Sequence, residues 1–112
     1  MRLRVLIAED EFYTRKSILK LVGDYPSSIP LELAEAKNGE EAMEQVRKAG
    51  APDIALLDIR MNNGDGFDLV RGLKEVNPNL LVTFISGYSE FGYAKEAIGL
   101  GVQSYLLKPV VT

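Results

Sequence analysis

The sequence predicts an α/β fold, in which helices cover both faces of a parallel β-sheet, and two observations support this class. Four short apolar runs are typical of strands that are buried in such a sheet: Leu3–Ala8, Ile54–Leu57, Leu80–Ile85 and Tyr105–Leu107. Between them, apolar residues recur at the spacing of amphipathic helices. Strand and helix patterns therefore alternate along the chain, which favours βαβ units around a parallel sheet.

The remaining elements follow from the residues between these runs. Residues 31–35 (Leu-Glu-Leu-Ala-Glu) alternate, as expected for a strand near the sheet edge with one wetter face. Asn38 is a candidate N-cap for the second of four helices, and Asn77-Pro78 stops the third. The four helical stripes are Ile18, Leu19 and Val22; Ala42, Met43, Val46 and Ala49; Phe67, Val70 and Leu73; and Phe91, Ala94 and Ile98.

Length and composition indicate one ordinary globular domain. The chain has 112 residues, of which 46% are hydrophobic and 26% charged, with a net charge of −3. A mildly acidic chain has no electrostatic footprint for nucleic acid, so we expect no direct DNA or RNA binding. The sequence has no cysteine and no histidine, which excludes disulfides, thiol catalysis and imidazole chemistry. No run approaches the roughly 18 apolar residues of a membrane helix, so we expect a cytoplasmic protein without a membrane anchor.

Each of the four apolar runs ends in polar residues that can act together. Glu9 and Asp10 follow the first run, Asp58 the second, Ser86 the third and Lys108 the fourth. Ligands of parallel α/β sheets bind outside the carboxyl ends of the strands, so these side chains are expected to converge. Clustered carboxylates repel unless a cation neutralises them, and Mg²⁺ prefers such oxygen ligands. An aspartate can also accept a phosphoryl group, and a lysine can hold its oxygens.

Each of these residues also has a simpler interpretation when it is considered alone. Glu9-Asp10-Glu11 could be a solvated acidic helix start, and Asp58 could cap the loop that follows it. Lys108 could be a surface lysine and Ser86 an ordinary strand-end serine. Their joint order at four successive strand ends favours the common site.

These residues occur in four motifs that resemble the receiver domain of two-component response regulators. The motifs are Val5-Leu6-Ile7-Ala8-Glu9-Asp10-Glu11, Leu56-Leu57-Asp58-Ile59-Arg60-Met61, Ile85-Ser86-Gly87 and Tyr105-Leu106-Leu107-Lys108-Pro109. The resemblance extends from Leu3 to Pro109 and implies a doubly wound, flavodoxin-like (CheY-like) five-stranded parallel sheet in the order 2-1-3-4-5. It further implies a signalling domain, not a turnover enzyme, that accepts a phosphoryl group from a sensor histidine kinase.

The resemblance also implies roles for individual residues. Asp58 would be the phospho-acceptor and a ligand of Mg²⁺, together with Asp10 and the backbone carbonyl of Arg60, and Glu9 would support the ion through water. Lys108 and Ser86 would contact the phosphoryl group. Tyr105 would be the aromatic partner whose rotamer follows Ser86, although a plain strand aromatic is the simpler interpretation of this tyrosine.

Several partners are implied as well. The kinase is expected to dock along the first helix, around residues 12–22, unless that stripe is all core. Residues 86–94 resemble receivers joined to AraC-type DNA-binding domains, so we expect such a C-terminal effector domain in a transcription regulator, and a possible homodimer.

The sequence departs from the family pattern in three places. Glu9 replaces the commoner aspartate, Asn62 stands where a proline usually occurs, and Gly64 also departs from the usual loop, so we expect the loop 61–66 to be flexible. Only Pro109 to Thr112 follow the last strand, so the fifth helix is absent. We therefore expect 1–112 to be a receiver domain truncated after the fifth strand, with an exposed sheet face that promotes self-association or low stability.

Two competing interpretations remain open at the sequence level. An aspartate-nucleophile phosphatase needs a second acid two residues after its nucleophile, where this chain has Arg60. A pseudo-receiver that acts only as a protein-interaction module is the stronger alternative, although every chemical position is occupied.

Overall fold

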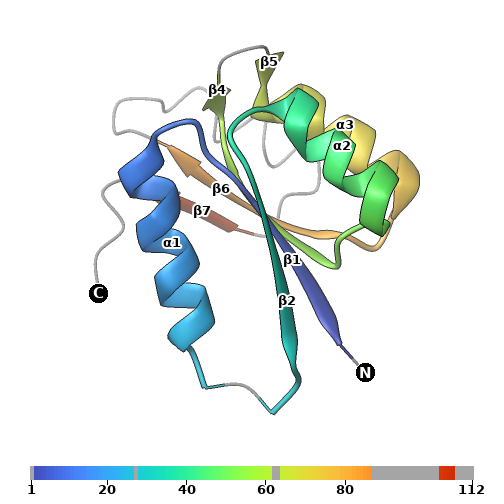
Figure 1. The fold of residues 1–112 in the computed structure, drawn as a ribbon. Helices are drawn as coiled ribbons and strands as arrows, with labels where there is room; N and C mark the ends of the chain where they lie inside the picture. The colour runs from blue at the N-terminus through green and yellow to red at the C-terminus, as the bar shows by residue number, and fades with distance from the viewer. Residues whose placement is uncertain (1, 27, 62–63, 87–103, 108–112) are drawn as a thin grey trace.

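A five-stranded parallel sheet forms the centre of the fold (Figure 1), in a computed structural model that describes residues 2–26, 28–61, 64–86 and 104–107. The strand order is β2-β1-β3-β6-β7, and every neighbouring pair is parallel. The strands are β1 (Leu3–Ala8), β2 (Leu31–Ala36), β3 (Ile54–Asp58), β6 (Leu81–Ser86) and β7 (Ser104–Leu107). The flavodoxin-like order predicted from the sequence is confirmed, with β2 at an edge as expected.

Helices cover both faces of the sheet (Figure 1). α1 (Phe12–Asp24) lies on one side, and α2 (Gly39–Ala49) and α3 (Gly66–Val76) lie together on the other. The fourth predicted helix, around Phe91 to Ile98, lies outside the described residues. None of the described helices is long and apolar enough to span a membrane.

Alternate residues of the central strands pack into two separate hydrophobic clusters. Leu6 and Leu57 belong to the larger cluster under α2 and α3, which also contains Phe67, Val70 and Leu73 of the predicted third stripe. Val5 and Ile7 belong to a smaller cluster under α1. A cavity of about 490 Å³ lies on the α1 face, lined by Val5, Leu21, Val22, Tyr25, Leu31, Ile54 and Leu56.

The helix ends show how local sequence sets the element bounds. Asn38 caps α2 as predicted, since its side-chain oxygen accepts a hydrogen bond from the Glu41 N–H at 2.7 Å. The helix ends at Gly50, whose φ of 94° is a left-handed conformation that favours glycine. The Arg4 guanidinium lies against this glycine, where an added Cβ would be 2.8 Å from Nη1.

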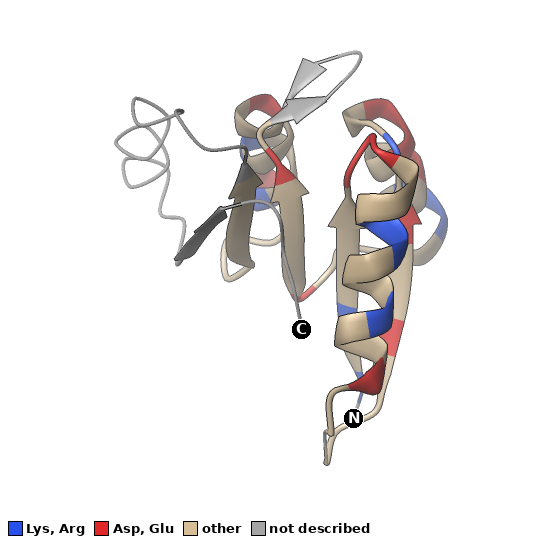
Figure 2. Cartoon of the chain, turned by 90° about the vertical axis from the view of Figure 1, so that its left-hand side faces the viewer, with Lys and Arg blue, Asp and Glu red and all other residues tan. Residues whose placement is uncertain are grey.

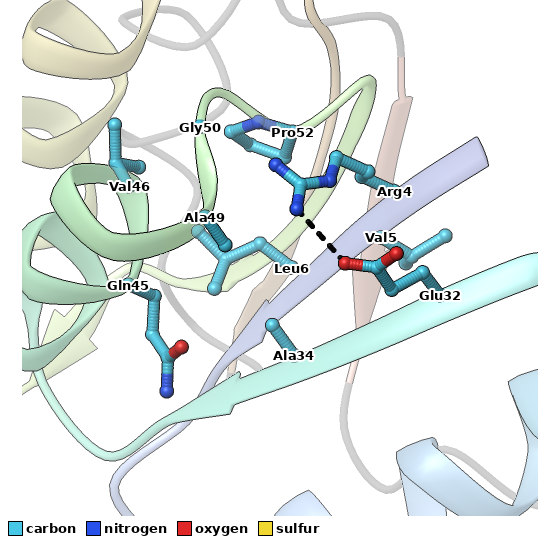
Figure 3. A pocket seen from close by; sticks show the side chains of 10 residues that line it. All are labelled: Arg4, Val5, Leu6, Glu32, Ala34, Gln45, Val46, Ala49, Gly50 and Pro52. Carbon is cyan, nitrogen blue, oxygen red and sulfur yellow. Dashed lines mark hydrogen bonds and ion pairs between the residues drawn. The ribbon is translucent and has the colours of Figure 1, made fainter. Parts of the chain in front are cut away.

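A small cavity of about 30 Å³ lies beside this glycine, between α2 and the edge of the sheet (Figure 3). An ion pair of 2.9 Å between Arg4 and Glu32 borders it, and Gln45 contributes another polar side chain. This volume has room for roughly one or a few water molecules and lies well below the roughly 300–1,000 Å³ of small-molecule sites.

One short element was not predicted. β4 (Arg60–Met61) pairs with β5 (Gly64–Asp65) in an antiparallel two-stranded ribbon directly after β3. The sequence suggested only a flexible loop in this region, because two-residue strands have no periodicity to detect. The ribbon leads into α3 and lies above the end of the main sheet (Figure 1).

Candidate functional site

Three carboxylates meet at the carboxyl end of the sheet. Glu9 and Asp10 follow β1, and Asp58 is the last residue of β3, the neighbouring strand. One oxygen from each side chain lies within 4.8 Å of the others. Figure 2 shows acidic segments at this end of the strands and at the start of α1, besides others at the opposite end of the sheet. The convergence predicted from the strand ends is therefore confirmed for these three residues.

The acidic residues Glu9 and Glu11, which follow β1, have different structural roles. Glu11 caps α1, since its carboxylate accepts hydrogen bonds from the backbone N–H of Tyr13 at 3.3 Å and of Thr14 at 2.6 Å. Glu9 instead points inward and is only 1% exposed, and its Oε2 accepts from the Glu11 N–H at 3.1 Å. The interpretation of the triplet as a solvated helix start is thus right for Glu11 and wrong for Glu9.

Asp58 is held by close packing of the chain around it. Its side chain is 4% exposed, and its strand lies between β1 and β6. Behind it, the Gly66 N–H donates to the Ile59 carbonyl at 2.6 Å. A Cβ on Gly66 would lie 2.5 Å from the Asp58 carbonyl oxygen and 2.9 Å from Cε1 of Phe84. Only glycine fits here, and sequence reasoning gave Gly66 no such role.

Three other predicted site residues are placed by their backbone. Arg60 begins β4, two residues beyond Asp58. Asp58 is the register partner of Ile85, so Ser86 extends one residue further along β6. Tyr105 pairs in register with Phe84, and Ser86 with Leu107. Lys108 lies outside the described residues, directly after the register partner of Ser86.

Sequence reasoning also missed a charged clamp beside Glu9. The Arg15 side chain, which is 12% exposed, donates to the Glu9 backbone carbonyl and forms an ion pair with Glu35, both at 2.9 Å. Lys16 also bonds Glu35, at 3.0 Å to each oxygen. The hydrogen bonds from Lys16 and Arg15 hold the pKa of Glu35 below its usual value. No sequence signal distinguishes Arg15 from the exposed lysines of the same helix.

The donor set of this site fits a hard divalent cation. Two carboxylates that are 4 Å apart repel by about 4 kcal/mol at an effective dielectric near 20. Two of the three acids, Glu9 and Asp58, are buried, where charge is hardest to tolerate. All three offer oxygen atoms, which Mg²⁺ and Ca²⁺ prefer. The cluster of Glu9, Asp10 and Asp58 therefore offers the oxygen donors that a metal ion needs.

Sheet order, strand-end acids and helix arrangement agree with those expected of a receiver domain. A family model described as "Response regulator receiver domain" matches residues 5–112, and the chain belongs to that family. The receiver ("REC") domain of AraT, a response regulator from Geobacillus stearothermophilus, is 37% identical and superposes with a TM-score of 0.81. That match covers 98% of this chain and 84% of the solved one.

Curated relatives include transcriptional regulators. The chain is 34% identical to YesN, an uncharacterized transcriptional regulatory protein of Bacillus subtilis, over 95% of this chain and 28% of YesN. It is 32% identical to the transcriptional regulatory protein HptR of Staphylococcus aureus, over 96% of this chain and 41% of HptR. The chain thus spans less than half the length of these relatives.

Proposed function

We propose that this receiver domain accepts a phosphoryl group on Asp58 from a phosphohistidine of a sensor kinase, with Mg²⁺ bound beside it. One observation carries the proposal: the buried Asp58 carboxylate shares its surroundings with Glu9 and Asp10, all within 4.8 Å. A buried acid that lies beside two other acids at the end of a strand is a candidate functional group. Family membership supports the same assignment.

The cluster would bind Mg²⁺ through Asp10, Asp58 and the Arg60 backbone carbonyl, with Glu9 acting through water. The ion would place positive charge next to the phosphoryl oxygens, where the transition state gathers negative charge. Lys108 and Ser86 would contact the same oxygens. The place of Ser86 supports its part of this assignment, because Ser86 ends the strand beside Asp58.

The transfer itself needs no base from this chain. An Asp58 carboxylate oxygen forms the new P–O bond as the P–N bond to the donor imidazole breaks. The electron pair of that bond returns to the imidazole nitrogen, which takes up a proton from solvent. The chain's own contribution is to hold Asp58 in line and to exclude bulk water from it. Burial of Asp58 and its close packing on Gly66 serve both tasks.

Signalling would follow from the new phosphoryl oxygens. Once they draw in the Ser86 hydroxyl, Tyr105 of the adjacent strand can fill the space that the serine leaves. Register supports this pairing, since Tyr105 lies opposite Phe84, two residues before Ser86. Such a change conveys a signal only if it biases a surface with two states.

The partners belong to the same proposal. Phe12 and Tyr13 are 51% and 77% exposed at the start of α1, close to the acidic cluster, and form an apolar contact for the kinase. The regulated partner would be a C-terminal effector, of the AraC type by the resemblance of residues 86–94, in a cytoplasmic regulator that can form homodimers. The greater length of YesN and HptR is consistent with an attached effector.

Acetyl phosphate tests the assignment of Asp58 without a kinase. The protein is incubated with the donor in Mg²⁺ or in EDTA, and its intact mass is compared with that of the Asp58→Asn variant. We expect one phosphoryl adduct that requires Mg²⁺ and is absent from the variant. An unchanged mass in Mg²⁺, with circular dichroism showing a folded protein, would reject the proposal in favour of an interaction-only module. An adduct of equal yield on Asp58→Asn would reject Asp58 as the acceptor.

A further inference from the structure

The β1–α1 turn carries two of the three clustered acids, and its backbone is held from two sides. On one side the Glu9 N–H donates to the Ala36 carbonyl of β2 at 3.0 Å. On the other side Arg15 Nη1 donates to the Glu9 carbonyl at 2.9 Å. The backbone N–H and C=O of Glu9 are therefore both hydrogen-bonded to neighbouring elements. These two bonds hold the backbone from which the next residue, Asp10, extends.

Arg15 is itself restrained by three contacts. Besides the Glu9 carbonyl, its Nε bonds Glu35 at 2.9 Å, and its guanidinium carbon lies 5.5 Å from the centre of the Phe12 ring. The side chain is only 12% exposed. A guanidinium can donate to two acceptors from its planar fork, which a lysine ammonium cannot reproduce in the same geometry.

We propose that Arg15 is a positioning residue for the metal site, which acts by clamping the Glu9 carbonyl between α1 and the end of β2. This inference rests on the proposed function, because it assigns a role toward the same cation. Three mutually repelling carboxylates would move apart without restraint, which separates the ligands that a cation must find together. Some residues do not bind the metal but hydrogen-bond to its ligands and orient them. Removing such a residue typically lowers metal affinity by about 10- to 100-fold.

Lys16 provides a matched control on the same helix. It carries the same charge and bonds the same Glu35, yet it reaches Glu35 from a side chain that is 46% exposed. Within the described part of the chain, its hydrogen bonds go to Glu35 and not to the Glu9 backbone. Simple electrostatics predicts that removal of either positive charge strengthens cation binding at the acidic cluster. A positioning role predicts the opposite sign for Arg15 alone.

Direct Mg²⁺ titration by calorimetry, without any phosphoryl donor, separates these outcomes. We expect Arg15→Gln to raise the Kd for Mg²⁺ about tenfold, and Lys16→Gln to leave it unchanged or lower it. Arg15→Lys should also bind more weakly than wild type, because charge without the fork does not restore the clamp. Circular dichroism and thermal unfolding in EDTA establish that each variant is folded.

If Arg15→Gln does not fold, Arg15→Lys takes its place. It keeps the positive charge, so simple electrostatics predicts no change in the Kd for Mg²⁺, whereas a positioning role predicts a rise. Equal Kd values for the Arg15 and Lys16 variants, or tighter binding by Arg15→Gln, would overturn the inference and leave the proposed function intact. A wild-type chain that binds no Mg²⁺ would overturn both.

Discussion

The position of Asp58 depends on close packing against Gly66, which has no side chain. Gly66 starts α3 directly against the Asp58 carbonyl, and its N–H bonds the Ile59 carbonyl at 2.6 Å. Any larger residue must displace either the backbone of β3 or the buried ring of Phe84. Both belong to the core of the site, so neither can move cheaply.

Gly66→Ala should therefore lower the free energy of unfolding by about 1–3 kcal/mol, as an overpacked site does. Gly39→Ala is the matched control, since an added Cβ at Gly39 meets nothing within 4 Å at the start of α2. That control should be neutral or slightly stabilising, because alanine reduces the entropy of the unfolded chain. Urea unfolding of both variants measures the difference. Equal stability of the two variants would contradict the close packing of Gly66 against the Asp58 carbonyl and Phe84.

Single residues of the site were predictable where a chemical pattern marked them. Glu9, Asp10 and Asp58 stood out because carboxylates followed apolar strands, and the structure brings these three together. Gly66 and Arg15 could not be found in this way. Their roles depend on distances between segments that are far apart or on different elements, and a glycine or a helical arginine has many ordinary explanations.

At the scale of elements, the start of α1 shows how one acidic run serves both the fold and the site. Glu11 accepts from two backbone N–H groups and from the Thr14 hydroxyl at 2.7 Å. The sequence predicted the Asn38 cap of α2 because asparagine is a preferred N-cap residue. It did not predict Glu11 as a cap, because glutamate is not among those residues and its neighbours are equally acidic.

Glu11→Ala should lower the free energy of unfolding by about 1 kcal/mol, the usual loss for a removed cap, and should leave Mg²⁺ affinity close to that of wild type. Glu9→Gln should do the reverse: Mg²⁺ affinity falls, while stability in EDTA is kept or rises because repulsion with Asp10 and Asp58 is relieved. Urea unfolding and Mg²⁺ titration of both variants test this division. A larger loss of affinity in Glu11→Ala than in Glu9→Gln would refute it.

The order of the sheet elements was predictable from periodicity and from the resemblance, and the bounds were close. The predicted strand over residues 3–8 coincides with β1, whereas β3 ends one residue later than predicted, at Asp58, and β6 is shifted by one residue to Leu81–Ser86. Polar side chains at strand ends conceal the last ladder position, since alternation and apolar runs give no signal there. The β4–β5 ribbon is too short to leave any periodic pattern.

At the scale of the whole molecule, surface ion pairs tie stability to pH. Hydrogen bonds from Arg2 and Arg4 hold the pKa of Glu32 below 4.5, and those from Lys16 and Arg15 do the same for Glu35. The unfolded chain then binds more protons than the folded one between the two pKa values. The stabilisation from these pairs is therefore fully present above the unfolded value and is lost as the pH falls through the lowered one.

The Glu35→Gln variant tests this dependence. The difference in unfolding free energy between wild type and variant should be largest near neutral pH and shrink once the pH falls below 4.5, the usual value for glutamate. Because these side chains are partly exposed, about 1 M salt should also reduce the difference. Urea unfolding across a pH series provides the measurement. A difference that stays constant from neutral to strongly acidic pH would exclude the ion pairs as its origin.

The Arg4–Glu32 pair bordering the small cavity in Figure 3 has a further consequence for how the molecule meets others of its kind. Arg4 and Glu32 are register partners on β1 and β2, and Arg2 reaches the same glutamate at 2.9 Å. β2 is an outer strand of the sheet, and an outer strand is a template on which a foreign strand can add. If the β2 strand of a second molecule added to this edge, its glutamates would lie close to those of the first molecule. The charged residues that link β2 to β1 therefore also disfavour intermolecular strand addition and aggregation.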